Sequence, residues 1–258
     1  MTTFLIAIIG IVAGIMSGLF GIGGGIIIVP SLIAFLGMDI LDANATSLAA
    51  MLLPVGILGV INYYKAGYIK LKDSLFISLG LLLGSYFGAE LALSVNVHLL
   101  AKLYATFLLY VAISYINIPT LIGRRKEEAI VQEEQLKGHS FFQFSGLGVL
   151  AGVIAGMFGK GGGLVIVPAL TKFFKYKPKA ATATSLAALQ LPVGLPSVIV
   201  YAENGHLNLV YATLMACGIV AGALVGSKLA IKLSSATFKK IYAIFLVGVA
   251  IYMVIKYL

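Results

Sequence analysis

The chain has 258 residues, of which 60% are hydrophobic and 10% are charged, and its formal net charge at pH 7 is +9. Soluble globular domains carry about 25% charged residues, and a mean hydropathy of +1.07 excludes an ordinary soluble domain. The sequence therefore predicts an integral membrane protein. Its single cysteine, Cys217, excludes an intrachain disulfide. Outside the short loops the sequence offers no basic surface with interleaved aromatic residues, so we expect no nucleic-acid partner.

The chain opens on an apolar segment, Phe4–Leu36, that is too long for one helical crossing of a bilayer. Its first residues lack the basic region of a signal peptide, so we expect a retained span. The run GIGGG, from Gly21 to Gly25, lies near the middle of the segment. Glycine destabilises a helix interior by about 1 kcal/mol relative to alanine. This block is therefore predicted to form two short helices joined at a glycine-rich tip.

Three further apolar blocks follow before a polar stretch, and four corresponding blocks come after it. The first group is Asn44–Tyr64, Ser74–Ser94 and Leu99–Ile122, and the second is Phe141–Phe174, Thr182–Ala202, Leu209–Leu233 and Phe238–Leu258. We expect a first transmembrane repeat over 1–122, a charged cytoplasmic linker over 123–139 and a second transmembrane repeat over 140–258. The expected fold is all-α, and each repeat has a glycine-broken opening hairpin followed by three transmembrane helices.

The two repeats match at a constant offset of 138 residues, so that Gly21 corresponds to Gly159 and Ser47 to Ser185. The best matched stretches are GLFGIGGGIIIVPSL with GMFGKGGGLVIVPAL, and ATSLAAMLLPVG with ATSLAALQLPVG. Duplicated apolar halves, interrupted by glycine at corresponding places, are typical of transporters whose substrate site lies between the halves.

The basic residues predict the orientation of the repeats. If each opening block returns to the face it came from, or crosses twice, fifteen of the 18 basic residues share one face. They are Lys65, Lys70, Lys72, Arg124, Arg125, Lys126, Lys137, Lys172, Lys175, Lys177, Lys179, Lys228, Lys232, Lys239 and Lys240. Short loops rich in Lys and Arg stay in the cytoplasm. The repeats are then inverted relative to one another, and both termini are expected outside the cytoplasm.

Each opening hairpin would place the start of a helix inside the bilayer. A helix N-terminus carries unpaired N–H groups and a partial positive charge, which together attract anions, and glycine lets an oxyanion approach closely. The alternative is close helix packing, which we expect for Gly80, Gly84, Gly88, Gly218, Gly222 and Gly226. The glycines predicted to bind substrate are Gly21, Gly23, Gly24, Gly25, Gly159, Gly161, Gly162 and Gly163.

Polar residues add to this predicted site. Lys160 replaces Ile22 of the first repeat; a cation at membrane depth costs about 2.5–3.5 kcal/mol and usually faces a polar cavity, although a lysine near the interface can snorkel. Gln190 lies opposite Leu52 and just before a proline. The remaining candidates either cap the next helices or line a substrate path. These are Asn44, Thr46, Ser47, Thr182, Thr184 and Ser185.

Motifs for catalysis or cofactor binding are missing from the sequence. It contains no HExxH, CxxC, Ser-His-Asp or Walker pattern, so we expect no enzyme activity, no cofactor and no metal site. A metal-ion permease would need carboxylates or thiolates in mid-membrane, and Lys160 opposes one. A non-transporting assembly protein would not need two inverted half-sites.

The duplicated glycine tip, followed by ATSL and proline, resembles the TauE/SafE sulfite exporter family, also called transmembrane sulfur-anion permeases. The resemblance rests on GLFGIGGGIIIVPSL with NATSLAAMLLPVG and on GMFGKGGGLVIVPAL with ATATSLAALQLPVG, and it spans nearly the whole chain. It implies export or exchange of sulfite, thiosulfate, sulfoacetate or related organosulfonates across the bacterial inner membrane. Inverted repeats would move the anion by alternating access.

The expected partners are therefore a small anionic substrate and membrane lipid. The sequence leaves the oligomeric state open, a homodimer included. The alternatives to a sulfur-anion exporter are a permease for another small anion or a metal ion, and a non-transporting membrane assembly protein.

Overall fold

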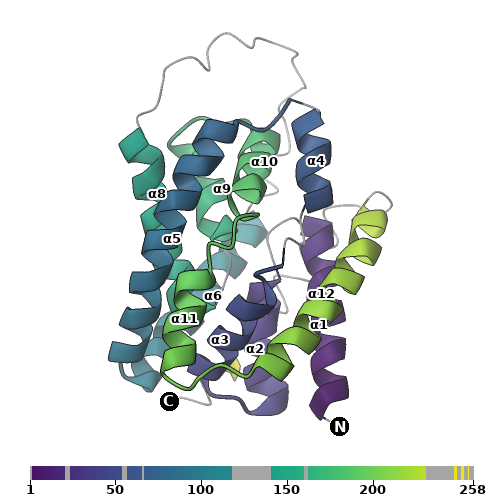
Figure 1. Ribbon diagram of the computed structural model, residues 1–258, viewed down its shortest axis with the longest axis vertical. Helices are drawn as coiled ribbons and strands as arrows, with labels where there is room; N and C mark the ends of the chain where they lie inside the picture. The colour runs from purple at the N-terminus through teal and green to yellow at the C-terminus, as the bar shows by residue number, and fades with distance from the viewer. Residues whose placement is uncertain are drawn as a thin grey trace.

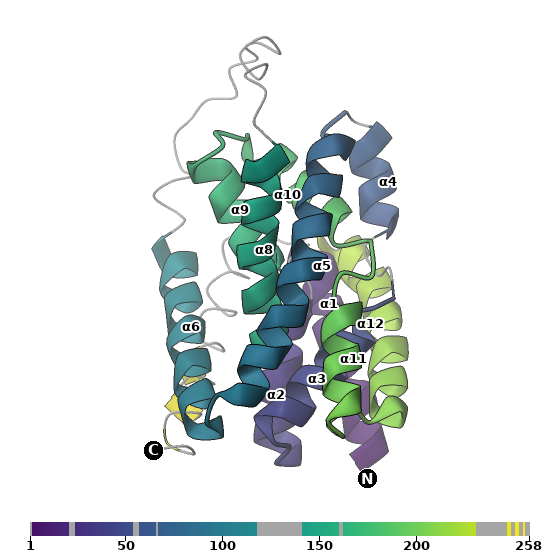
Figure 2. The ribbon, with the colours of Figure 1, turned by 60° about the vertical axis from the view of Figure 1, so that its left-hand side comes forward.

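A computed structural model describes residues 2–20, 24–53, 57–65, 67–117, 141–159 and 162–230, together with 247, 248, 251, 252 and 255. Within these residues the protein consists of helices and connecting turns, without strands. The helices follow a common long axis in both ribbon views (Figures 1 and 2). A helix pairs its backbone groups internally, which suits a chain of this hydropathy. The predicted linker, 123–139, lies outside the described residues.

Each half opens on a helical hairpin whose helices end and begin beside the glycine run. The four helices are α1 (Thr2–Phe20), α2 (Gly25–Leu36), α8 (Phe141–Phe158) and α9 (Gly163–Lys172). The residue before α2 is Gly24 and the residue before α9 is Gly162, and both are buried. The glycine runs thus divide each opening block into two helices.

The second block of each half is also divided, whereas the sequence predicts one span there. The helices are α3 (Ile40–Ala50), α4 (Ile57–Lys65), α10 (Pro178–Ala188) and α11 (Leu195–Glu203). In the second half, Pro192 lies in the break, and a proline removes one helical N–H and clashes with the preceding turn. A tight turn replaces the helix there, with bonds from Val193 N to Leu191 O (2.6 Å) and from Leu195 N to Pro192 O (2.9 Å). The corresponding Pro54 lies outside the described residues.

The remaining helices are long: α5 (Leu71–Ser94), α6 (Val97–Asn117) and α12 (Leu209–Ala230). The 24 residues of α5 extend about 36 Å, enough to cross the hydrocarbon layer of a bilayer. Among the described residues, α5 and α8 are the helices that are both long enough and apolar enough to cross a membrane. Their outward side chains include Phe142, which is 81% exposed, and Leu83, which is 62% exposed. Lipid would cover such side chains.

Two closely packed helix pairs join the halves, α5 with α8 and α1 with α12. A Cβ added to Gly84 would lie 2.1 Å from the Val149 carbonyl oxygen, and one added to Gly14 would lie 2.3 Å from that of Ile219. The two pairs are equivalent, because the offset of 138 relates α1 to α8 and α5 to α12. The predicted packing role is confirmed for Gly80, Gly84, Gly88, Gly218 and Gly222. In each of the two pairs, one helix from each half thus makes a backbone-to-backbone contact with the other half.

Corresponding helices run in opposite directions along the long axis. In Figure 1, α1 begins at the lower end, where the N-terminus is marked, and α8 begins at the upper end. Likewise α5 descends and α12 ascends, as the colour gradients of Figures 1 and 2 show.

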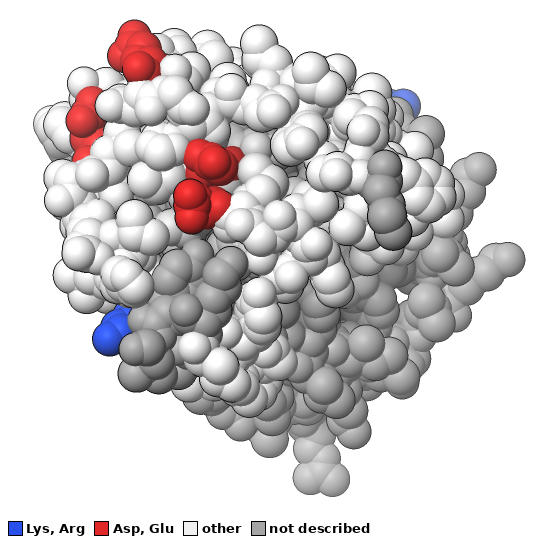
Figure 3. Space-filling view, turned by 90° about the horizontal axis from the view of Figure 1, so that it is seen from below, with Lys and Arg blue, Asp and Glu red and all other residues white. Residues whose placement is uncertain are grey.

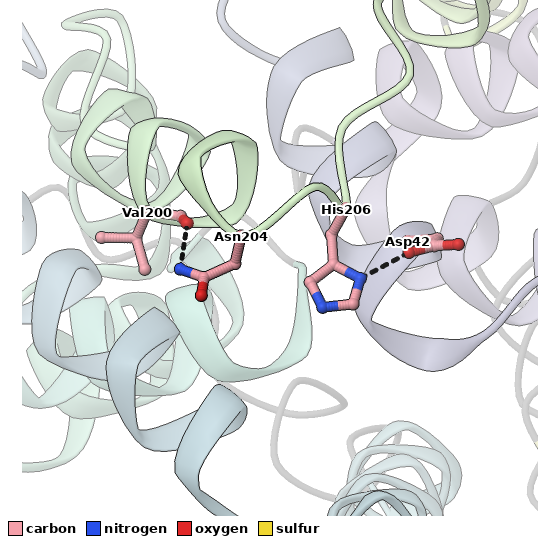
Figure 4. A network of polar contacts seen from close by, with 4 residues as sticks. All are labelled: Asp42, Val200, Asn204 and His206. Atoms are coloured by element: carbon pink, nitrogen blue, oxygen red, sulfur yellow. Dashed lines mark hydrogen bonds and ion pairs between the residues drawn. The ribbon is translucent and has the colours of Figure 1, made fainter.

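Polar contacts between side chains of the two halves are found at both ends of the described part of the molecule. At the lower end, His206 Nδ1 lies 2.6 Å from Asp42 Oδ1 (Figure 4). At the upper end, the Tyr176 hydroxyl donates to the Asp73 carboxylate, and burial, reinforced by this contact, raises the pKa of Tyr176 well above its usual value.

Substitution of Gly84 tests the close contact between α5 and α8. Gly84→Ala should destabilise the protein by about 1–3 kcal/mol, the usual range for overpacking, because the Val149 backbone must move away. Thermal unfolding in detergent, followed by tyrosine fluorescence, measures the change. Gly146→Ala is the matched control, since a Cβ there meets nothing within 4 Å. Equal melting temperatures for the two variants would contradict the assigned contact.

Candidate functional site

The glycine tip of the second hairpin lies against α3 of the first half. A Cβ added to Gly159 would lie 2.6 Å from Asn44 Cα, 2.9 Å from Asn44 Oδ1 and 2.9 Å from a methyl carbon of Val29. Gly159 also has a φ of +65°, in the left-handed region that residues with a Cβ rarely adopt. Both the backbone conformation and the close approach therefore require glycine at this position.

Side chains from α3 and α11 occupy the carbonyl end of α8. A helix leaves its last four carbonyl groups without partners of its own. Here Asn44 Nδ2 donates to the Met157 carbonyl (2.7 Å), Ser47 Oγ to the Gly159 carbonyl (2.7 Å) and the Tyr201 hydroxyl to the Gly156 carbonyl (2.9 Å). These bonds neutralise much of the negative end of α8 and tie the tip to both halves.

The starts of α2 and α9 present the opposite end of a helix dipole. Their N-cap residues, Gly24 and Gly162, have no side chain with which to cap the helix, and neither first turn contains an acidic residue. The Gly24 carbonyl accepts from Ile27 N, and the Gly162 carbonyl accepts from Val165 N. The N–H groups ahead of these donors have no partner within their own helices. Such buried N–H groups, with the dipole behind them, favour an anion.

Four predicted site residues carry buried polar atoms that have no hydrogen-bond partner. These atoms are Asn44 Oδ1, Thr46 Oγ1, Thr184 Oγ1 and Gln190 Oε1. Thr46 and Thr184 are equivalent at the offset of 138, and both are 0% exposed. More than nine in ten buried polar groups in folded proteins are paired, and an unpaired one costs about 1–3 kcal/mol. These atoms therefore mark where a ligand or bound water would supply hydrogen bonds.

Comparison with known proteins identifies the family. The model of the sulfite exporter TauE/SafE family matches residues 6–253. The chain belongs to the TauE/SafE family.

Curated relatives match this TauE/SafE protein over most of its length. The probable membrane transporter protein YunE of Bacillus subtilis is 26% identical over 262 residues, which cover 96% of this chain and 95% of the relative. A probable membrane transporter protein of Methanocaldococcus jannaschii is 32% identical over 243 residues, covering 89% and 87%. One from Haemophilus influenzae is 29% identical over 276 residues, covering 99% and 100%. No solved structure gives a significant match.

The predicted site residues of this TauE/SafE chain fall into three groups. Asn44, Ser47 and Gly159 meet at the second tip. Others lie in or beside the broken helices: Gly24, Gly25, Gly162, Gly163, Thr46, Thr184 and Ser185 are buried, and Thr182 and Gln190 are half-buried. The last group lies outside the described residues and consists of Gly21, Gly23, Lys160 and Gly161.

Sequence reasoning missed Tyr201 and a row of serines on α5. The serines donate across to the broken helix: Ser74 Oγ to Thr184 O (3.1 Å), Ser78 Oγ to Ala188 O (2.8 Å) and Ser85 Oγ to Val193 O (2.8 Å). The last two acceptors lie at the end of α10 and in the break after it, where the helix no longer pairs its carbonyls. Their spacing of four and seven residues on one helix face, beside the packing glycines, was the available signal. The equivalent positions on α12 hold Ala212, Ala216 and Ala223.

Removing one hydroxyl tests the capping of α8. Tyr201→Phe should destabilise the fold by about 1–3 kcal/mol, because the Gly156 carbonyl would stay buried without its donor. Tyr110→Phe is the matched control, since Tyr110 is 61% exposed. Detergent unfolding curves compare the two variants with the unmodified protein. Loss of stability in both variants alike would argue against the cap.

Proposed function

We propose that this protein carries small sulfur-containing anions, such as sulfite, thiosulfate, sulfoacetate or related organosulfonates, out of the cell across the inner membrane. The observation that carries the proposal is a difference in hydrogen bonding between the two helix ends at the second hairpin tip. Three side-chain donors occupy the carbonyl end of α8, whereas the buried start of α9 keeps N–H groups that its own helix does not use. This arrangement favours a negatively charged ligand. The choice of sulfur anions rests on the family.

The opposite directions of corresponding helices support an inverted relation between the halves. The upper end carries Lys65 in the last turn of α4 and Lys172 in the last turn of α9. On the described part of the lower end, Asp and Glu side chains stand out, and Lys and Arg show only at the edges (Figure 3). The positive-inside rule would then put the upper end in the cytoplasm and the start of α1 outside.

The transport mechanism that this arrangement supports is alternating access. One half would rock against the other around the tips, so that the anion meets each side of the membrane in turn. An inside-negative potential of 100 mV favours outward movement of each negative charge by about 2.3 kcal/mol. Export can therefore proceed without a coupled ion. A transporter role also agrees with the lack of catalytic motifs in the sequence.

Flux measurements test the proposal directly. Proteoliposomes loaded with radiolabelled sulfite should release it faster under an inside-negative potential than at zero potential, and protein-free liposomes should show neither effect. Flux that ignores the potential would contradict electrogenic export. The absence of flux for every sulfur anion tried, with folded protein, would contradict the function itself.

Thr46 and Thr184, which are equivalent in the two halves, allow a test at single residues. Thr46→Val keeps the side-chain shape and removes a hydroxyl that lacks a protein partner, so the fold should tolerate it. Affinity for the transported anion should fall roughly tenfold or more, because a hydrogen bond to a charged group contributes about 1.5–3 kcal/mol. Thr184→Val should behave in the same way.

The control for this pair is Thr213→Val on α12, whose hydroxyl is exposed and bonds to Leu209 O. Isothermal titration or a thermal-shift series with sulfite gives the affinities. Unchanged binding in both Thr46→Val and Thr184→Val would remove these hydroxyls from the site.

A further inference from the structure

Two amide side chains near the helix breaks, the buried Asn44 and the half-buried Gln190, use only their nitrogen atoms. Asn44 Nδ2 donates to Met157 O at 2.7 Å, and Gln190 Nε2 donates to Leu186 O at 3.0 Å. The oxygen of each amide has no partner. Rotating either amide by half a turn would bring its oxygen against a carbonyl oxygen, so these bonds fix the orientation. Both side chains therefore present a hydrogen-bond acceptor that the protein does not satisfy.

Asn44 Oδ1 lies at the second glycine tip. The Asn44 side chain is 0% exposed, and its oxygen would be 2.9 Å from a Cβ on Gly159. The chain continues from this tip into the N-cap of α9 at Gly162. The N-cap of α9 is thus three residues along the chain from Gly159, so N–H donors for an anionic group and a buried acceptor belong to the same tip. A ligand made only of acceptor atoms, such as sulfate, would leave that acceptor unpaired.

We infer that the substrate carries a hydrogen-bond donor as well as its negative charge, and that Asn44 Oδ1 accepts from this donor. The class is a monoanion with a hydroxyl or amine group, such as a hydroxyalkyl or aminoalkyl sulfonate, or an oxyanion that retains a proton, such as hydrogensulfite. This inference rests on the proposed function and narrows its substrate class. Sites that hydrogen-bond a substrate hydroxyl reject the analogue without it strongly, because their own polar groups are then left unpaired.

A pair of sulfonates of nearly equal size separates the donor from the charge. 2-Hydroxyethanesulfonate carries a hydroxyl where propane-1-sulfonate carries a methyl group, and both are monoanions. The full-length protein in detergent should bind the hydroxylated ligand at least tenfold more tightly, which corresponds to about 1.4 kcal/mol. Titration calorimetry or ligand-induced thermal stabilisation gives this ratio at one fixed pH.

Replacement of Asn44 identifies the acceptor. Asn44→Leu removes the amide oxygen and should bring the ratio of the two affinities below about threefold. It also removes the bond to Met157, so both affinities can fall; the ratio reports only on the acceptor. Asn204→Leu is the matched control, because Asn204 Nδ2 donates to Val200 O at 2.9 Å in the same manner but on an exposed residue (Figure 4). This control should keep the full ratio.

The outcomes distinguish this inference from the function on which it rests. Equal binding of the two sulfonates by the unmodified protein, or an unchanged ratio in Asn44→Leu, would overturn the inference and leave sulfur-anion transport standing. Binding that requires sodium would also overturn it, because the amide oxygen would then hold a cation. Failure of the folded protein to bind or transport any sulfur anion would instead overturn the proposed function.

Discussion

A helix that breaks inside an apolar molecule is subject to one constraint. The backbone N–H and C=O groups freed at the break need hydrogen-bond partners, because no water is there to supply them. At the ends of α8 and α10, this protein meets the constraint with side chains from neighbouring helices. Asn44, Ser47 and Tyr201 do so at the end of α8, and Ser78 and Ser85 do so at the break after α10. The starts of α2 and α9 receive no such side-chain cap. This imbalance between paired carbonyls and unused N–H groups would favour negative charge at the proposed site.

The halves are joined by close backbone packing between helices. Glycine lets α5 reach α8, and α1 reach α12, at backbone distance. Such surfaces hold by dispersion over a large area rather than by directional bonds. Hydrogen bonds are unequally shared, since α5 carries serines where α12 carries alanines. The broken helix α10–α11 therefore receives hydrogen bonds from α5 that the alanines of α12 cannot give to the equivalent helix of the first half.

The glycine runs and the two prolines show which helix boundaries the local sequence predicts and which it does not. The glycine runs predicted the ends of α1, α2, α8 and α9, because backbone entropy acts on each residue separately. The same reasoning predicted one span across Pro54 and one across Pro192, whereas the second block of the second half stops at Ala188 and resumes at Leu195. A single proline is tolerated in many membrane helices, so sequence alone did not separate a kink from a complete break. The additional turn bonds and the serine donors from α5 stabilise the broken form.

The sequence by itself determined the membrane class, the duplication and the position of the glycine tips, because composition, repetition and helix propensity are properties of short stretches. Only the tertiary structure decided which polar groups are satisfied. Asn44 finds its carbonyl 113 residues away and Ser47 finds one 112 residues away, and no local pattern predicts such partners. The same folding left the oxygen of Asn44 and the hydroxyls of Thr46 and Thr184 unpaired. Their availability to a ligand depends on what packs around them, which the chain settles only when its two halves come together.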